Sequence, residues 1–150
     1  TFNRLHFFSK YRSNVAVLVG YELELSRLLK LGSYIWLNNP RVTREASGTS
    51  GMTAAMNGSV NLSTYDGWIP EFAKDGKNSF VIPPADLKLD MDGQDQQDQE
   101  SLYHILESKV IPTYYGKPDT WHDIVVNGMK DVLPEFGSNR MAAQYFKELY

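Results

Sequence analysis

One stretch decides how this chain is interpreted: Glu45-Ala-Ser-Gly-Thr-Ser-Gly-Met52, followed by Thr53-Ala-Ala-Met-Asn-Gly58. Gly48 and Gly51 can adopt a positive φ and bring bare backbone close to a ligand, and the hydroxyl groups around them can bind polar atoms. Thr53 opens what resembles a helical first turn, whose free N–H groups would point back into the loop. The stretch therefore predicts either a cradle for an anion or a sugar, or an ordinary Gly/Ser turn before a capped helix.

Spacing and composition exclude several classes of function. The glycines match neither G-x-G-x-x-G nor a P-loop. The 150 residues carry a net charge of −3 and are 42% hydrophobic, which fits one compact domain and not a nucleic-acid-binding protein. The absence of cysteine excludes a disulfide scaffold and thiolate chemistry, and fits a cytoplasmic protein. We expect no membrane span, no signal peptide and, because Thr1 enters directly on an amphipathic pattern, a fragment of a longer chain.

Hydrophobic patterning predicts an α/β fold with a Rossmann-like parallel sheet and flanking helices. A helix with an aromatic inner face is expected at residues 2–8, and His6 is interpreted as structural. Val15–Val19 and Ser33–Leu37 are short apolar runs typical of buried parallel strands. Between them, a leucine stripe at residues 22–30 predicts a helix. Strand, helix and strand in this order indicate a parallel βαβ unit.

Further elements follow the central stretch. A helix is expected from Ser50 to Asn57, and strands at Ser59–Thr64 and Ser79–Ile82. The polar run Asp90–Glu100 is predicted to be a solvated loop rather than a metal site. Helices are expected after it, and their breaks are placed at Pro112, Pro134 and Gly137.

Position in the sheet favours a binding site at the central stretch. Ligands of open parallel sheets bind beyond the carboxyl ends of the strands. Both Gly20-Tyr21 and Asn38–Ser50 follow predicted strands. We therefore expect the site at Glu45–Gly51, with Asp66 forming an Asp-Gly turn nearby.

Tryptophans and arginines leave alternatives open. Trp36, Trp68 and Trp121 could stack on sugar rings, and we expect them mainly to pack, with Trp68 as the exception. Arg41 and Arg44 could bind a phosphate. They could equally be solvated or paired with acidic residues of the helix at residues 22–30 (Glu22 or Glu24).

The stretch at residues 45–58 strongly resembles the donor-sugar loop of the α-glucan (glycogen or maltodextrin) phosphorylase family, in its bacterial branch. The resemblance extends over nearly the whole chain, through Gly20-Tyr21, Trp36–Arg41, Leu62–Trp68, Val110–Tyr115 and Asn139–Tyr145. It implies the distal part of the C-terminal domain of a GT-B glycosyltransferase. Residues 1–97 would form a partial βαβ core and residues 98–150 the C-terminal helices.

The resemblance also implies roles for individual residues. The implied substrate-binding residues are Glu45, Ala46, Ser47 and Gly48, which would bind glucose through one carboxylate and backbone amides. The implied residues of a pyridoxal phosphate pocket are Tyr21, Thr49, Ser50 and Gly51. The implied reaction is glucosyl transfer between the end of an α-1,4-glucan and phosphate, without a metal ion. The implied small-molecule partner is glucose-1-phosphate, and an exposed sheet edge favours homo-oligomers.

One position departs from the family pattern. Thr53 stands where the resemblance implies the lysine that holds pyridoxal phosphate as a Schiff base, and threonine has no amine. The nearest lysines in sequence, Lys30 and Lys74, lie on other elements, so neither is expected to stand in easily. Three interpretations remain: a weakly held cofactor, a pocket reused for a nucleotide sugar as in glycogen synthases, or a catalytically inactive glucan-binding relative. The isolated fragment is expected to be inactive in each case.

Overall fold

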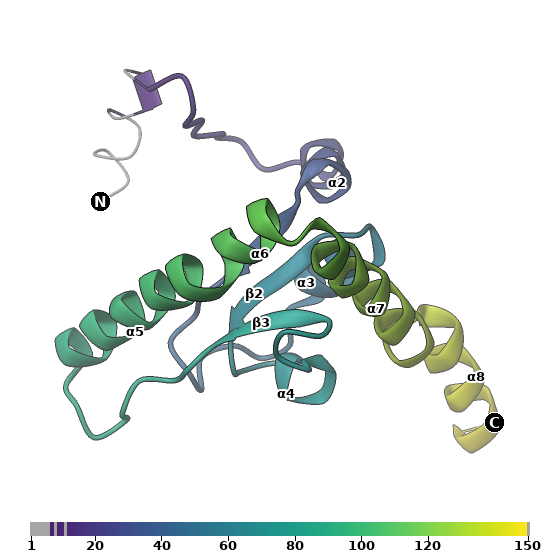
Figure 1. The fold of residues 1–150 in the computed structure, drawn as a ribbon. Helices are drawn as coiled ribbons and strands as arrows, with labels where there is room; N and C mark the ends of the chain where they lie inside the picture. The colour runs from purple at the N-terminus through teal and green to yellow at the C-terminus, as the bar shows by residue number, and fades with distance from the viewer. Residues whose placement is uncertain (1–6, 8, 11, 150) are drawn as a thin grey trace.

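The computed structural model describes residues 7, 9, 10 and 12–149, and its centre is a three-stranded parallel sheet. The strands are β1 (Ile35–Asn38), β2 (Val60–Thr64) and β3 (Ser79–Ile82), in the order β1-β2-β3 (Figure 1). All neighbours are parallel. The predicted α/β, Rossmann-like class is confirmed. The helix expected at residues 2–8, including His6, lies outside the described residues except for Phe7.

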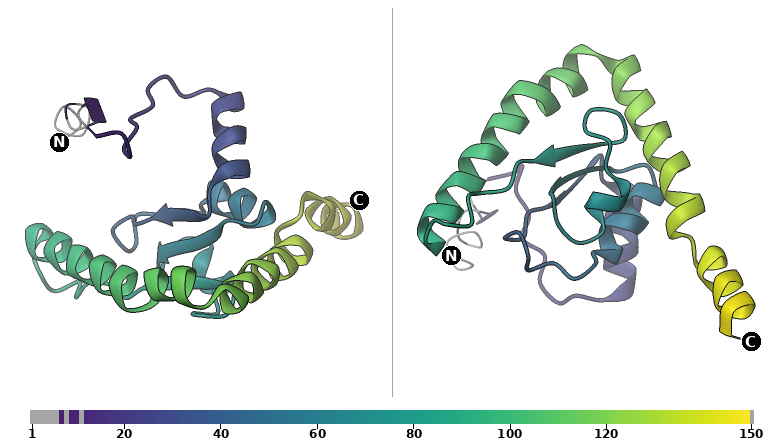
Figure 2. Two further views of the ribbon diagram at one scale, coloured as in Figure 1. Left: turned by 45° about the horizontal axis from the view of Figure 1, so that its top comes forward. Right: turned by 90° about the horizontal axis from the view of Figure 1, so that it is seen from below.

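Helices flank this sheet and extend the chain at both ends. They are α2 (Leu23–Gly32), α3 (Thr49–Met56), α4 (Ile69–Phe72), α5 (Met91–Ile105), the π-helical turn η1 (Leu106–Val110), α6 (Ile111–Gly116), α7 (Pro118–Phe136) and α8 (Ser138–Leu149). Figure 2 shows α5 to α6 and α7 as two long arms that meet at an angle over the sheet. In the described ranges, no helix combines the length and apolar character of a membrane span.

Strand β2 organises the core because both of its faces are buried. On one face, Val60 and Leu62 pack with β3 against η1 and the ends of α5 and α7 that lie next to it. This cluster comprises Val60, Leu62, Phe80, Ile82, Ile105, Val110, Trp121 and Ile124. A second cluster joins α3, α4 and α7 through Ala55, Trp68, Ile69, Phe72 and Val132. Continuous burial on two faces is the environment that short apolar strands of parallel sheets require.

The predicted strand at Val15–Val19 does not form. These residues have no regular structure, and Val19 is 66% exposed. The βαβ unit expected here therefore lacks its first strand, although the helix α2 and the strand β1 after it are present. A parallel strand is stable when helices cover both of its faces, and nothing in the described part of the chain covers this run.

The prediction of a loop at Asp90–Glu100 is also wrong, because α5 begins at Met91. The Asp90 side chain caps this helix by accepting a hydrogen bond of 2.9 Å from the Gly93 N–H. The first turns of α5 are exposed and have no apolar stripe, so hydrophobic periodicity could not reveal them. The expected breaks at Pro112 and Pro134 do not occur, since Pro112 lies in the first turn of α6 and Pro134 within α7.

Candidate functional site

The central loop is fixed by the turn that follows the neighbouring strand. The Glu45 N–H donates to Asp66 Oδ2 at 3.0 Å, and the Trp68 N–H donates to the Ser47 carbonyl at 2.9 Å. Gly67 lies between these contacts with a φ of +60°, and a Cβ there would be 2.5 Å from the Ser47 oxygen. Parallel strands end at the same edge of a sheet, so the loop after β1 and the turn after β2 meet beyond their carboxyl ends.

Asp66 does more than form the predicted Asp-Gly turn. Burial alone would raise the pKa of its carboxyl group, but backbone N–H groups of Glu45, Gly67, Thr43 and Arg44 together hold the pKa below its usual range. The carboxylate thus stays charged and gathers the backbone of residues 43–45 around it. This anchoring was not predicted, and its only sequence signal was an Asp-Gly pair just after a strand.

The two glycines of the loop differ from one another. Gly48 has the predicted positive φ, +99°, and is the N-cap of α3. Gly51 does not, because it lies within α3 and is buried. Its role is close packing: a Cβ would be 2.8 Å from Asn61 Oδ1, while Asn61 Nδ2 donates to the Gly51 carbonyl at 3.1 Å. The absence of a side chain lets α3 approach β2.

The entry to α3 presents a run of unused backbone donors. In the described part of the chain, the N–H groups of residues 46–50 have no hydrogen-bond acceptor. Ala46, Ser47 and Thr49 are exposed, and Ser50 is half-buried. Successive free N–H groups at a helix N-terminus attract anions and polar oxygens. The Glu45 carboxylate adds an acceptor beside these donors, so the loop can bind a ligand with several hydroxyl groups.

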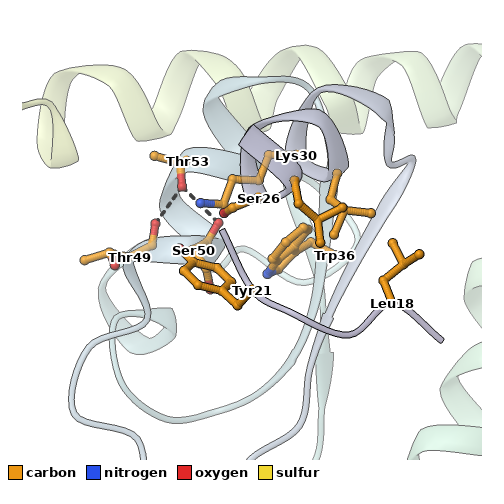
Figure 3. Close-up of a pocket in the computed structure, with 10 residues that line it drawn as sticks. Leu18, Tyr21, Ser26, Lys30, Trp36, Thr49, Ser50 and Thr53 are labelled. Atoms are coloured by element: carbon orange, nitrogen blue, oxygen red, sulfur yellow. Dashed lines mark hydrogen bonds between the residues drawn. The ribbon is translucent and has the colours of Figure 1, made fainter. Parts of the chain in front are cut away.

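A cavity of about 520 Å³ opens on the other side of the same helix end, between α2 and α3 (Figure 3). Its walls include Tyr21, Lys30, Trp36, Thr49, Ser50 and Thr53. The size lies within the usual range of small-molecule sites. Four residues predicted from separate parts of the sequence, namely Tyr21, Thr49, Ser50 and Thr53, are thus brought together. Gly51 is not among the lining residues.

Thr53 contributes no free group to this cavity. Its hydroxyl donates within α3, to the carbonyls of Thr49 at 2.9 Å and Ser50 at 3.2 Å. Lys30 lies on the opposite wall, in the last turn of α2. Lys30 and Thr53 belong to different helices, as expected, but both line one cavity because α2 lies beside α3. No sequence spacing indicated it.

Of the three tryptophans, Trp121 behaves as predicted and Trp68 and Trp36 do not. Trp68 is 3% exposed and stacks on Phe72 with ring centroids 4.4 Å apart, so the sugar-stacking role suggested for it is wrong. Trp121 packs in the core at 8% exposure, as expected. Trp36 is only half-buried and is the tryptophan that lines the cavity.

Arg41, one of the two arginines near the loop, forms an ion pair that was not among the alternatives considered for it. Arg41 forms two hydrogen bonds of 2.6 Å with Asp95 of α5. The partner is thus an acidic residue of α5, and not Glu22 or Glu24. Glu24 pairs instead with Arg27, and Glu22 caps α2 by accepting from the Leu25 N–H. No three His, Asp or Glu side chains gather as a metal site would need, as far as the described residues show.

The sequence of the chain is similar to those of several phosphorylases. It is 39% identical over 141 residues to the maltodextrin phosphorylase of Thermococcus litoralis and 37% identical over 146 residues to the glycogen phosphorylase of Mycobacterium bovis. Each match covers 94% of this chain and 17% of the relative. The glycogen phosphorylase of Aquifex aeolicus is 36% identical over 146 residues, covering 94% of the chain and 20% of the relative. No protein-family model matches. Over nearly its whole length, the chain is therefore similar to one segment of the maltodextrin and glycogen phosphorylases, a segment that makes up 17–20% of those proteins.

Proposed function

We propose that this chain supplies the donor-binding part of a retaining glucosyltransferase of the α-glucan phosphorylase type. Such an enzyme moves glucosyl units between the end of an α-1,4-glucan and phosphate. The observation that carries the proposal is the anchored Glu45 beside the free N–H groups of residues 46–50. The names of the relatives, maltodextrin and glycogen phosphorylase, favour an α-glucan as the substrate.

Glu45 and the three residues after it bind the transferred glucose. The carboxylate accepts hydrogen bonds from sugar hydroxyls, and the N–H groups of Ala46, Ser47 and Gly48 donate to sugar oxygens. Because Asp66 and Gly67 hold the loop backbone, these groups are positioned before the sugar arrives. Preorganised groups of this kind stabilise an oxocarbenium-like transition state without reorganisation during the reaction.

The start of α3 binds the phosphate side of the reaction. Thr49 and Ser50 offer two hydroxyls with no acceptor among the described residues, together with their N–H groups. The helix dipole adds a favourable interaction with an anion, on the order of 1 kcal/mol. Arg41 forms an ion pair with Asp95, so it is not a free partner for the phosphate.

A cofactor of the pyridoxal phosphate type fits the adjoining cavity. Tyr21 and Trp36 can hold its ring, and Thr49 and Ser50 its phosphate. When bound, the cofactor supplies a phosphate group that exchanges protons with the attacking phosphate. The chain itself positions that group and keeps apolar walls around the ring, with Leu25 among the lining residues.

A nucleotide-sugar donor is the second candidate, and Thr53 is the observation that favours it. Without an amine at this position, α3 cannot form the covalent bond to pyridoxal phosphate that the family resemblance implies. The cavity would then hold part of a nucleotide. In that enzyme Glu45 would still bind the transferred glucose, so the two candidates share the sugar site and differ in the leaving group.

The experiment compares Glu45→Gln with Glu107→Gln in the intact protein. Glu107 is exposed on η1, away from the loop, and serves as the matched control. We expect Glu45→Gln to lower kcat about 100-fold, because a charged acceptor that strengthens in the transition state is lost, while the control keeps its activity. Activity is measured with glucose-1-phosphate and with nucleotide glucose, each with and without pyridoxal phosphate.

The two glucosyl donors distinguish the phosphorylase candidate from the synthase-like candidate. Turnover with glucose-1-phosphate supports the phosphorylase, and turnover with nucleotide glucose alone replaces it by the synthase-like candidate. Unchanged turnover in Glu45→Gln rejects the role of this residue. Glucan binding without turnover of any donor means a non-catalytic relative.

A further inference from the structure

We propose that Lys30 is the amine that binds the aldehyde carbon of a pyridoxal-phosphate-type cofactor, in place of the amine that Thr53 lacks. The inference rests on the proposed function, because it places that cofactor in the cavity between α2 and α3. It adds a covalent site on a different helix from the one that the sequence resemblance implies.

The position of Lys30 carries the inference. It belongs to the last turn of α2 and is half-buried. Lys30 and Thr53 line the same 520 Å³ cavity and also a neighbouring hollow of about 260 Å³. Figure 3 shows the Lys30 side chain extending from α2 toward Thr53 and Ser50, across the opening between the two helices. The Lys30 side chain therefore reaches from the α2 wall of the cavity toward the α3 wall, which carries Thr49, Ser50 and Thr53.

The Lys30 amine is not engaged elsewhere in the described part of the chain. The ion pairs found there use Arg27, Arg41, Lys74 and Lys109 as their cations, and no hydrogen bond is found from Lys30 Nζ. Lys74, the other lysine considered from the sequence, is bound to Asp131 at 3.0 Å and lies outside the cavity. Lys30 thus lines the cavity with an amine that has no partner in the described part of the chain.

The other walls determine the chemical class of the ligand. The hydroxyls of Thr49 and Ser50 and the free N–H groups at the start of α3 suit a phosphate. Tyr21 and Trp36 offer aromatic surfaces for a planar ring. A ligand with an anion at one end, a ring in the middle and an aldehyde directed at Lys30 would use all three features.

The covalent step needs no further reactant. The neutral Lys30 amine attacks the aldehyde carbon, and a C=N bond forms as the carbonyl oxygen leaves as one molecule of water. No electron is transferred. The apolar side chains of Leu25 and Leu29 belong to the same wall of the cavity as Lys30, on α2.

The experiment uses the intact protein, pyridoxal 5′-phosphate and borohydride, which converts the C=N bond into a stable adduct. Peptide mass spectrometry then locates the adduct. We expect close to one adduct per chain, on the peptide that contains Lys30. Lys30→Gln and Lys30→Arg should both remove it, and the arginine variant keeps the charge as a check on folding. Lys74→Gln is the matched control and should label like the unmodified protein.

Two further arms test the geometry. Thr53→Lys in the Lys30→Gln background should restore the adduct at residue 53, because both positions face one cavity. Pyridoxal without its phosphate should label Lys30 at least about tenfold less, since the contacts at the start of α3 are lost. Labelling spread over many lysines, equal labelling by both aldehydes, or binding without any adduct overturns the proposal.

The readout separates this inference from the proposed function. Glucan turnover that depends on Glu45, combined with no adduct at Lys30, rejects the role of Lys30 and leaves the proposed function standing. A specific adduct at Lys30, combined with no turnover of any glucosyl donor, supports the role of Lys30 and rejects the proposed function.

Discussion

The two halves of this chain, residues 12–38 and the part that contains β2 and β3, have similar apolar patterns but differ in burial. On the side that contains residues 12–38, the helix α2 has no buried residue and Leu23 is 80% exposed. On the side of β2 and β3, Leu62 is 1% exposed and Ile82 is fully buried. The comparison teaches that apolar periodicity shows which residues seek a core, whereas burial depends on whether other elements cover them.

The candidate site spans the boundary between these halves. The loop that carries Glu45 is held by the turn after the buried strand β2, through Asp66 and Gly67. The wall of the cavity that carries Tyr21 and Lys30 belongs to the uncovered half. The loop that carries Glu45 therefore depends on the core, while the cavity depends on how α2 stays beside α3.

The largest expected difference between the halves is in core packing. Leu62→Ala removes a buried side chain from the main cluster and should lower the free energy of unfolding by about 2–5 kcal/mol. Leu23→Ala, at an exposed position of α2, should change it by less than about 0.5 kcal/mol. Urea unfolding of the two variants measures the contrast. Equal losses would mean that α2 is covered in solution.

The next difference concerns two glycines with a positive φ. Gly67→Ala should destabilise the protein by roughly 2–4 kcal/mol, because it adds left-handed strain and a Cβ 2.5 Å from the Ser47 oxygen. Gly20 has a φ of +78° with nothing within 4 Å of a Cβ, and its segment has no regular structure. Gly20→Ala should therefore cost only the left-handed strain, about 1–2 kcal/mol, and less where the segment relaxes.

Thermal unfolding measures the stability of the two glycine variants. The affinity of the intact protein for glucose tests whether the loop keeps its position. Gly67→Ala should weaken binding, since the carbonyl and carboxylate of the loop must move away from the new methyl group. A Gly67→Ala protein as stable as Gly20→Ala would show that the turn relaxes and does not fix the loop.

The smallest expected difference appears in acid. The pKa of Asp66 is lower in the folded protein than in the unfolded chain, so its stabilisation is present above the unfolded value of about 3.9 and is lost as the pH falls through the folded value. The pKa of Glu24 is lowered too, because the Arg27 side chain donates hydrogen bonds to its carboxylate. That pair, however, is exposed on α2 and screened by water.

Urea midpoints between about pH 2 and pH 7 measure this effect. Asp66→Asn should flatten the acid loss of stability, and Glu24→Gln should flatten it less. Salt at about 1 M should remove the Glu24 contribution and keep most of that of Asp66. The same flattening in both variants would contradict the difference drawn between the two halves.

Local patterns predicted most of the sheet side correctly. The strand Ser79–Ile82 was predicted with its observed bounds, β2 differs from its predicted range by one residue at its start, and α3 by one residue at each end. These elements are short and bounded by turn residues, and the core covers them. Val15–Val19 has an equally apolar pattern and failed as a prediction because no described element packs on it. Asp90–Glu100 failed for the opposite reason, since a capped, solvated helix needs no apolar stripe.

The amino-acid sequence by itself determined the likeness to phosphorylases, the parallel sheet, the loop that follows its first strand, and the absence of an amine at Thr53. These are properties of residue types and of their order, which neighbours along the chain express. Only the tertiary structure decided that Asp66 anchors Glu45, that Trp68 is buried, and that Lys30 faces Thr53 across one cavity. The physical reason is that these contacts join residues 21 to 23 positions apart or on different helices, and packing alone sets such distances.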